Sequence, residues 1–142
     1  MRRVLVVANE TAGESHLRDE MRSRMDREPH EFILLVPAKR PHGKATWTEG
    51  EARQVARERM DAAIEEMTAM GAIVTGDVGV APTEFDCVMD ALRTASYDEI
   101  IISTLPHHIS HWLRMDLPDR VARNTAIPVT HVASRSGKHS AA

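Results

Sequence analysis

Short runs of apolar residues alternate along this chain with longer stretches in which apolar residues recur every three or four positions. A short run rich in Val, Ile and Leu is typical of a strand buried on both faces, whereas the longer period is typical of an amphipathic helix. Strands that alternate with helices are joined by right-handed crossovers into a parallel sheet covered on both faces. The alternation therefore predicts a three-layer α/β/α fold.

We expect five strands in this sheet, each bounded by turn residues or by a helical stretch. They are Val4–Ala8, Phe32–Val36, Ala72–Val80, Ile100–Ile102 and Pro128–Val132. The predicted helices lie between Gly13 and Pro29, over Glu49–Met70, from Thr83 onwards and over Asp116–Arg123. Gly71 follows the longest of them, as expected of a residue that ends a helix.

The composition fits one globular domain. The chain has 142 residues, 42% of them hydrophobic, and its single cysteine, Cys87, excludes an internal disulfide. We expect a domain over residues 1–133 and a flexible polar tail over 134–142. The apolar run near the N-terminus is too short for a signal peptide or a membrane span, so the expected location is cytoplasmic. The net charge of −3 comes from scattered residues and predicts no binding of nucleic acid.

Several segments resemble the universal stress protein family. They are a first strand that ends in a polar turn, a Gly-x-x-Pro start to the third helix at Gly79 and Pro82, the strand segment Tyr-Asp-Glu-Ile-Ile-Ile and the terminal Ile-Pro-Val-Thr-His-Val. The resemblance extends from about Arg3 to Val132. It implies the strand order 3-2-1-4-5 of the adenine nucleotide α-hydrolase-like group. It also implies a homodimer formed through the last strand.

The resemblance also implies how ATP would bind and where this chain differs. ATP-binding members carry Gly-x-x-Gly, nine residues and then Gly-Ser or Gly-Thr after the fourth strand, where backbone amides hold phosphates. Here Pro106 lies near the first glycine pair, and Asp116 and Pro118 lie near the second. Proline lacks an amide donor and Asp116 adds a negative charge. Asn9 replaces the acidic residue that often ends strand one. We therefore expect that ATP is not bound in the family's usual way; the cofactor is unknown, with ATP or another nucleotide as candidates.

Ligands of doubly wound sheets bind where the strand order reverses, which here is between strands one and four. Three loops meet there, Asn9–Gly13, Pro37–Thr48 and Ser103–Asp116, and they are rich in basic, hydroxyl and imidazole groups that suit a small anionic ligand. The predicted ligand-binding residues are Asn9, Thr11, Arg40, Lys44, Ser103, Thr104, His107, His108, His111 and Arg114.

Other residues in and near these loops have structural interpretations. His107 and His111 have helical i, i+4 spacing, but no second set of zinc ligands accompanies them, so no metal site is predicted. Asp116 is expected to cap the helix that follows it. Trp112 is expected to pack in the core or at an interface, and Cys87 to be a packed thiol within a helix.

Two functions from different classes remain open. The first is a non-enzymatic regulatory or small-ligand-binding module like a universal stress protein. The alternative is a nucleotide-binding or hydrolysing enzyme of the adenine nucleotide α-hydrolase-like group, with loop histidines as acid and base groups. The segment Asn9–Gly13 follows strand one where such enzymes have Ser-Gly-Gly-x-Asp. This difference favours the binding module.

Overall fold

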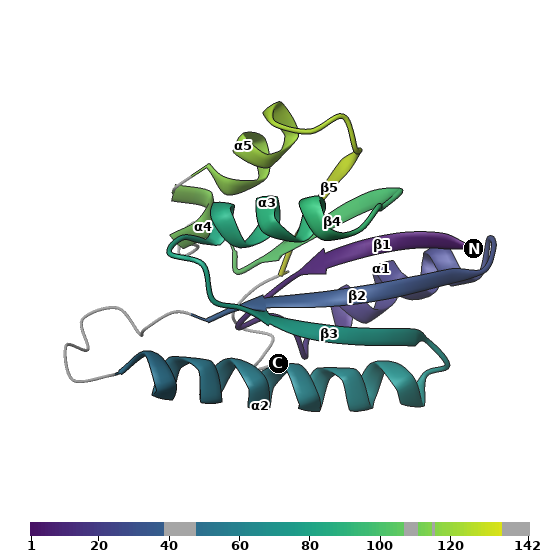
Figure 1. The fold of residues 1–142 in the computed structure, drawn as a ribbon. Helices are drawn as coiled ribbons and strands as arrows, with labels where there is room; N and C mark the ends of the chain where they lie inside the picture. Colours follow the sequence, from purple (N-terminus) through teal and green to yellow (C-terminus); the bar gives the residue numbers. More distant parts are fainter. Residues whose placement is uncertain (39–47, 107–110, 115, 135–142) are drawn as a thin grey trace.

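The computed structural model describes residues 1–38, 48–106, 111–114 and 116–134. Within them, one sheet has the strand order β3-β2-β1-β4-β5 (Figure 1). Its strands are β1 (Arg2–Val7), β2 (His30–Pro37), β3 (Ile73–Gly79), β4 (Glu99–Thr104) and β5 (Val129–Ala133). The helices are α1 (Ser15–Met25), α2 (Glu49–Ala69), α3 (Glu84–Thr94), α4 (His111–Arg114) and α5 (Leu117–Arg123). All four strand pairings are parallel, so the predicted fold class and strand order are confirmed.

Successive residues of β1 face opposite sides of the sheet, as the two-residue period of a strand requires. Val4 and Val6 pack into one core with α1 and α2, where Met60 is one of the contacts. Leu5 and Val7 pack into the other core, with α3, α4 and α5. Figure 1 shows α2 along one side of the sheet and α3, α4 and α5 on the other. Because both faces of β1 are fully buried, the strand is apolar at every one of these positions.

Side-chain caps and a glycine set the ends of the longer helices. Thr48 and Glu51 form a capping box at the start of α2, with Thr48 Oγ1 accepting from Glu51 N at 3.0 Å and Thr48 N donating to Glu51 Oε1 at 2.7 Å. Gly71 follows the helix with φ of +100°, a conformation that glycine adopts without steric cost. Thr83 Oγ1 accepts from Asp86 N at 3.0 Å and caps α3.

The start of α5 differs from the sequence prediction. Asp116 occupies the N-cap position, but its side chain makes no capping hydrogen bond. Its backbone is left-handed, with φ of 60°, whereas a capping residue normally has an extended backbone. The carboxylate instead lies 3.5 Å from Arg123 Nη2 at the last turn of the helix. Helix α4 is also new, because the sequence predicted a loop over Ser103–Asp116.

Ser134, the first residue of the segment expected to be a flexible tail, is attached to the domain. It is buried, its amide donates to the Thr104 carbonyl at 2.8 Å, and its hydroxyl donates to Glu14 Oε1 at 3.2 Å. The rest of that segment, residues 135–142, lies outside the described residues. No helix within the described parts of the chain is long and apolar enough to cross a membrane.

Candidate functional site

The carboxyl ends of the central strands bring two of the predicted site residues into contact. Thr11 lies in the turn that follows β1, and Ser103 lies near the end of β4. Their hydroxyl oxygens are 2.5 Å apart, so one hydroxyl donates to the other. This contact confirms that the turn after β1 and the end of β4 meet at one edge of the sheet.

Four of the predicted site residues that the structure describes at this end of the sheet are already hydrogen-bonded within the protein. Asn9, Thr11, Ser103 and Thr104 are each at most 4% exposed. The Thr104 hydroxyl donates to the Leu105 carbonyl at 2.9 Å and lies 2.9 Å from His131 Nε2. Buried polar groups need such partners, because a lost hydrogen bond in the interior is costly. These four residues are therefore buried and hydrogen-bonded at the carboxyl ends of β1 and β4.

Asn9 connects the end of β1 to two other elements. Its amide nitrogen donates to the Pro37 carbonyl at 2.7 Å, at the end of β2. Its amide oxygen accepts a hydrogen bond from Nη1 of Arg59, which reaches across from α2. Arg59 was not predicted as a site residue. It lies within a run of charged residues that the sequence indicates only as a solvated helix face.

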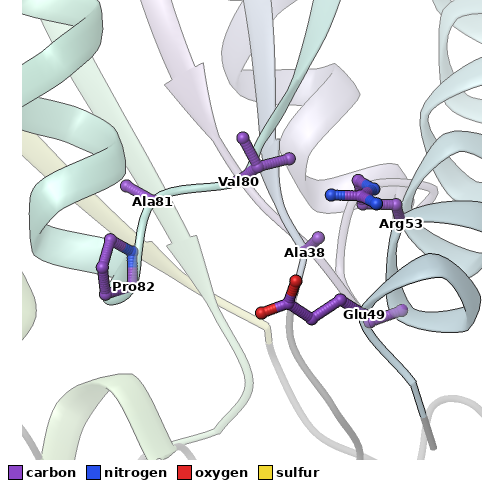
Figure 2. A pocket seen from close by; sticks show the side chains of 7 residues that line it. Ala38, Glu49, Arg53, Val80, Ala81 and Pro82 are labelled. Atoms are coloured by element: carbon purple, nitrogen blue, oxygen red, sulfur yellow. The ribbon is translucent and has the colours of Figure 1, made fainter.

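A cavity of about 440 Å³ opens at the same edge of the sheet, at the carboxyl ends of β2 and β3 (Figure 2). Ala38 and residues 80–82 line it from the strand ends, and α2 contributes the rest. The residues of α2 that line it are Glu49, Ala52 and Arg53. The cavity lies one strand away from the crevice between β1 and β4 where the sequence predicted the ligand.

The cavity combines small apolar walls with two groups of opposite charge. In Figure 2 the Arg53 guanidinium and the Glu49 carboxylate extend from the α2 side toward the strand ends, the first above Ala38 in the view and the second below it. Among the described residues, neither Glu49 nor Arg53 has an ion-pair partner. A polar ligand in this cavity would therefore find one acceptor group and one group of cationic donors.

Six of the predicted ligand-binding residues are not placed against the crevice. Arg40, Lys44, His107 and His108 lie outside the described residues. His111 and Arg114 are the first and last residues of α4, and the positions of their side chains are not described. In the described parts of the chain, no three His, Cys, Asp or Glu side chains are grouped so that they could hold a metal ion.

Cys87 and Trp112 pack in the core that includes α3, α4 and α5. Cys87 is 4% exposed, and its burial raises the pKa of the thiol, which disfavours the reactive thiolate. Trp112 is 5% exposed, so its indole is covered by the protein. Arg120, next to the turn at Asp116, lies over the Phe85 ring at 4.1 Å. These residues hold α3, α4 and α5 together.

The comparisons with known proteins agree with this topology. No protein-family model and no curated protein sequence matches the chain. A solved protein of the universal stress protein family from Burkholderia pseudomallei is similar over 93% of this chain and 96% of its own, with a TM-score of 0.62 and 16% identity. The fold is that of the universal stress proteins.

Two further structures with the universal stress protein fold were solved with nucleotides. One, from Archaeoglobus fulgidus in complex with dAMP, covers 93% of this chain and 97% of its own, with a TM-score of 0.64 and 14% identity. The other, from Arabidopsis thaliana with AMP bound, covers 97% of this chain and 95% of its own, with a TM-score of 0.65 and 10% identity. At these identities the likeness concerns the fold.

Within this universal stress protein fold, the described residues after β4 include two prolines and an exposed aspartate. Pro106 and Pro118 have no amide to donate. Asp116 places a carboxylate, more than half of whose surface is exposed, at the start of α5. A phosphate placed at this turn would meet a negative charge, because that carboxylate has only an exposed partner in Arg123.

Proposed function

We propose that this protein is a regulatory, small-ligand-binding module, and that it holds a small anionic molecule of the nucleotide class at the carboxyl edge of its sheet. The cavity beside Ala38 carries the proposal, because it opens at the carboxyl ends of the parallel strands, one strand away from the point where the strand order reverses and doubly wound sheets bind their ligands. The AMP and dAMP in two proteins of the same fold support this ligand class.

We expect ATP to bind weakly or not at all. Pro106 and Pro118 offer no amides, and the Asp116 carboxylate lies at the turn where the phosphates of ATP would rest. A nucleotide with a single phosphate avoids most of this repulsion, because fewer charges approach the turn. The proposal therefore predicts a preference for AMP over ATP.

A binding role is favoured over catalysis by how the crevice uses its polar groups. Among the described residues there, the Asn9 amide and the Thr11, Ser103 and Thr104 hydroxyls are hydrogen-bonded within the protein. A general acid or base needs a group oriented toward the substrate. These residues therefore support a rigid floor for a ligand.

We further propose that the protein is a homodimer that pairs along β5. This strand lies at an end of the sheet, so one of its edges has no partner strand within the described chain. Every second residue of β5 points its backbone N–H and C=O groups away from β4, and a second copy of the chain could pair with these groups.

Native mass spectrometry of freshly purified protein, followed by calorimetry with AMP and ATP, tests the ligand. We expect a copurified or added mononucleotide to bind at about micromolar affinity, about −8 kcal/mol, and ATP to bind more weakly. Ala38→Phe should weaken binding by placing a phenyl ring in the cavity. Ala62→Phe, at an exposed position of α2, is the control. ATP binding as tight as AMP binding would refute the ATP prediction, and no binding of any mononucleotide would refute the ligand class.

A further inference from the structure

The guanidinium of Arg59, a residue of α2, is held at the end of β1 by a neutral side chain. The Arg59 guanidinium donates to the Asn9 amide oxygen, and Asn9 is itself only 4% exposed. The Pro37 carbonyl can only accept a hydrogen bond, so the Asn9 nitrogen must face it and the Asn9 oxygen must face Arg59. The orientation of the Asn9 amide is therefore determined by its partners.

Within the part of the chain that the structure describes, Arg59 lacks the carboxylate partners that two other anchored arginines have. Arg24 forms ion pairs with Glu20 and Glu99, and Arg18 forms one with Glu66. Among the described residues, no carboxylate lies within ion-pair distance of Arg59. A guanidinium has five N–H donors, and the contact with Asn9 uses one of them. Arg59 is also exposed, so its other donors can reach a ligand.

From this geometry we propose that Arg59 is the residue that selects an anionic ligand, and that Asn9 positions it. The proposal deepens the proposed function and rests on it. The group recognised is a phosphate or a carboxylate, because the planar fork of a guanidinium matches two oxygens of either group. The anion then lies at the end of β1 and next to the cavity, because Asn9 bonds to the carbonyl of Pro37, which directly precedes the cavity residue Ala38.

The role proposed for Arg59 requires that the side chain of residue 9 is uncharged. An aspartate there would form an ion pair with Arg59 and neutralise it, whereas the asparagine amide holds the guanidinium and leaves its charge unchanged. The aspartate would also lose the donor to the Pro37 carbonyl. We therefore expect the Asn9→Asp variant to lose the preference of the protein for anionic ligands.

Calorimetry with AMP and adenosine, which differ by one phosphate, tests the role of Arg59. In Arg59→Gln we expect AMP affinity to fall about tenfold or more, because charge-assisted hydrogen bonds are lost, while adenosine affinity changes less than about twofold. Arg57→Gln removes the same charge from an exposed position of the same helix and should leave both affinities unchanged. Arg59→Lys should retain part of the preference. Equal losses for AMP and adenosine in Arg59→Gln, or the same losses in Arg57→Gln, would overturn the assignment.

A second measurement separates this inference from the nucleotide proposal. Titration of the wild-type protein with inorganic phosphate and, separately, with acetate is followed by NMR at the Arg59 Nε–H and the Asn9 side-chain amide. We expect saturable shifts at both groups in the wild type and no shift at the Asn9 amide in Arg59→Gln, and the tighter of the two ions indicates whether the ligand carries phosphate or carboxylate. Shifts with these ions but no binding of adenosine or AMP would support the anion site and refute the nucleotide class. No shift with either ion would refute the role of Arg59 even if adenosine binds.

Discussion

Arg24 of α1 and Glu99 of β4 are joined by two hydrogen bonds, from Nε to Oε1 at 2.8 Å and from Nη2 to Oε2 at 2.7 Å. Their side chains are 8% and 16% exposed, so the pair is largely shielded from water. Thr130 of β5 also donates to Glu99 Oε2, at 2.6 Å, and Glu20 accepts from Arg24. These contacts raise the pKa of Arg24 and lower the pKa of Glu99, in each case chiefly through the hydrogen bonds between the two.

Glu99→Gln is expected to lower the free energy of unfolding by about 3 kcal/mol, because it removes a charge and leaves Arg24 buried with only Glu20 to balance it. Urea unfolding at neutral pH measures the change. Asp90→Asn is the matched control, since the pair of Asp90 with Arg93 is mostly exposed and should contribute less than about 1 kcal/mol. Equal effects of the two substitutions would contradict the structural role of Glu99.

The same carboxylate predicts how stability depends on pH. Since folding lowers the pKa of Glu99 below its ordinary value of 4.5, the unfolded chain takes up the proton first as the pH falls. The stabilisation by Glu99 is therefore fully present above about pH 4.5 and is lost as the pH falls through the folded-state pKa. Urea midpoints measured across this range should decline less steeply in Glu99→Gln than in the wild type. Parallel curves would show that Glu99 does not contribute.

Gly76→Ala is expected to destabilise the protein by about 1–3 kcal/mol through overpacking. An added Cβ would lie 2.7 Å from Ile64 Cδ1 and 2.8 Å from Met60 Sδ, so these two side chains of α2 would have to shift from their packed positions. Gly50→Ala is the control, because its Cβ would meet nothing closer than 3.7 Å and alanine favours a helix. Thermal unfolding should show a lower melting temperature for Gly76→Ala and an unchanged or higher one for Gly50→Ala.

The left-handed backbone of Asp116 predicts an order of stability among substitutions. Asp116→Gly should be at least as stable as the wild type, because glycine adopts φ of 60° without steric cost. Asp116→Ala should lose about 1 kcal/mol, since alanine has the Cβ that penalises this conformation and lacks a polar side chain. Urea unfolding midpoints of the two variants measure this difference in stability. An alanine variant more stable than the glycine variant would contradict the assigned conformation.

Ala133→Pro tests the proposed pairing of two copies along β5. The Pro128 carbonyl and the Ser134 amide form hydrogen bonds with β4. Backbone groups of successive strand residues point to opposite sides, so the amide of Ala133 points away from β4, to the unpaired side of β5. Proline there removes a donor needed by a second copy without removing a bond to β4. Scattering at micromolar concentration should give twice the chain mass for the wild type and the single mass for the variant. A wild-type monomer would refute the dimer.

Much of the fold follows from local patterns in the sequence. The apolar runs at Val4–Ala8 and Ile100–Ile102 belong to strands because both faces of β1 and β4 are buried, and Gly71 ends α2 because it can adopt a positive φ. The strand order came from the family resemblance, since periodicity does not specify which strands are neighbours. Helix α4 was missed because four residues are too few to show a period.

The candidate site was only partly accessible to sequence reasoning. The rule for parallel sheets correctly brought Thr11 and Ser103 together, but it did not reveal that these hydroxyls satisfy each other. Arg59 has the same residue type as Arg57 and lies in the same charged run. The one available signal is that Arg59 directly precedes Met60, which faces the core, so its side chain starts at the margin of the buried face. Its partner on β1 depends on tertiary packing.

The attachment of Ser134 to Thr104 and Glu14 determines where protein engineering can be done safely. All strands run in the same direction, so Arg2 lies at the amino ends of the strands and Ser134 lies at their carboxyl ends. The cavity also lies at the carboxyl ends. An affinity tag or fluorescent fusion added after Ser134 would be tethered beside the proposed ligand site. The same tag before Arg2 would be separated from the proposed site by the length of the strands, which makes the amino end the better place for a label in binding assays.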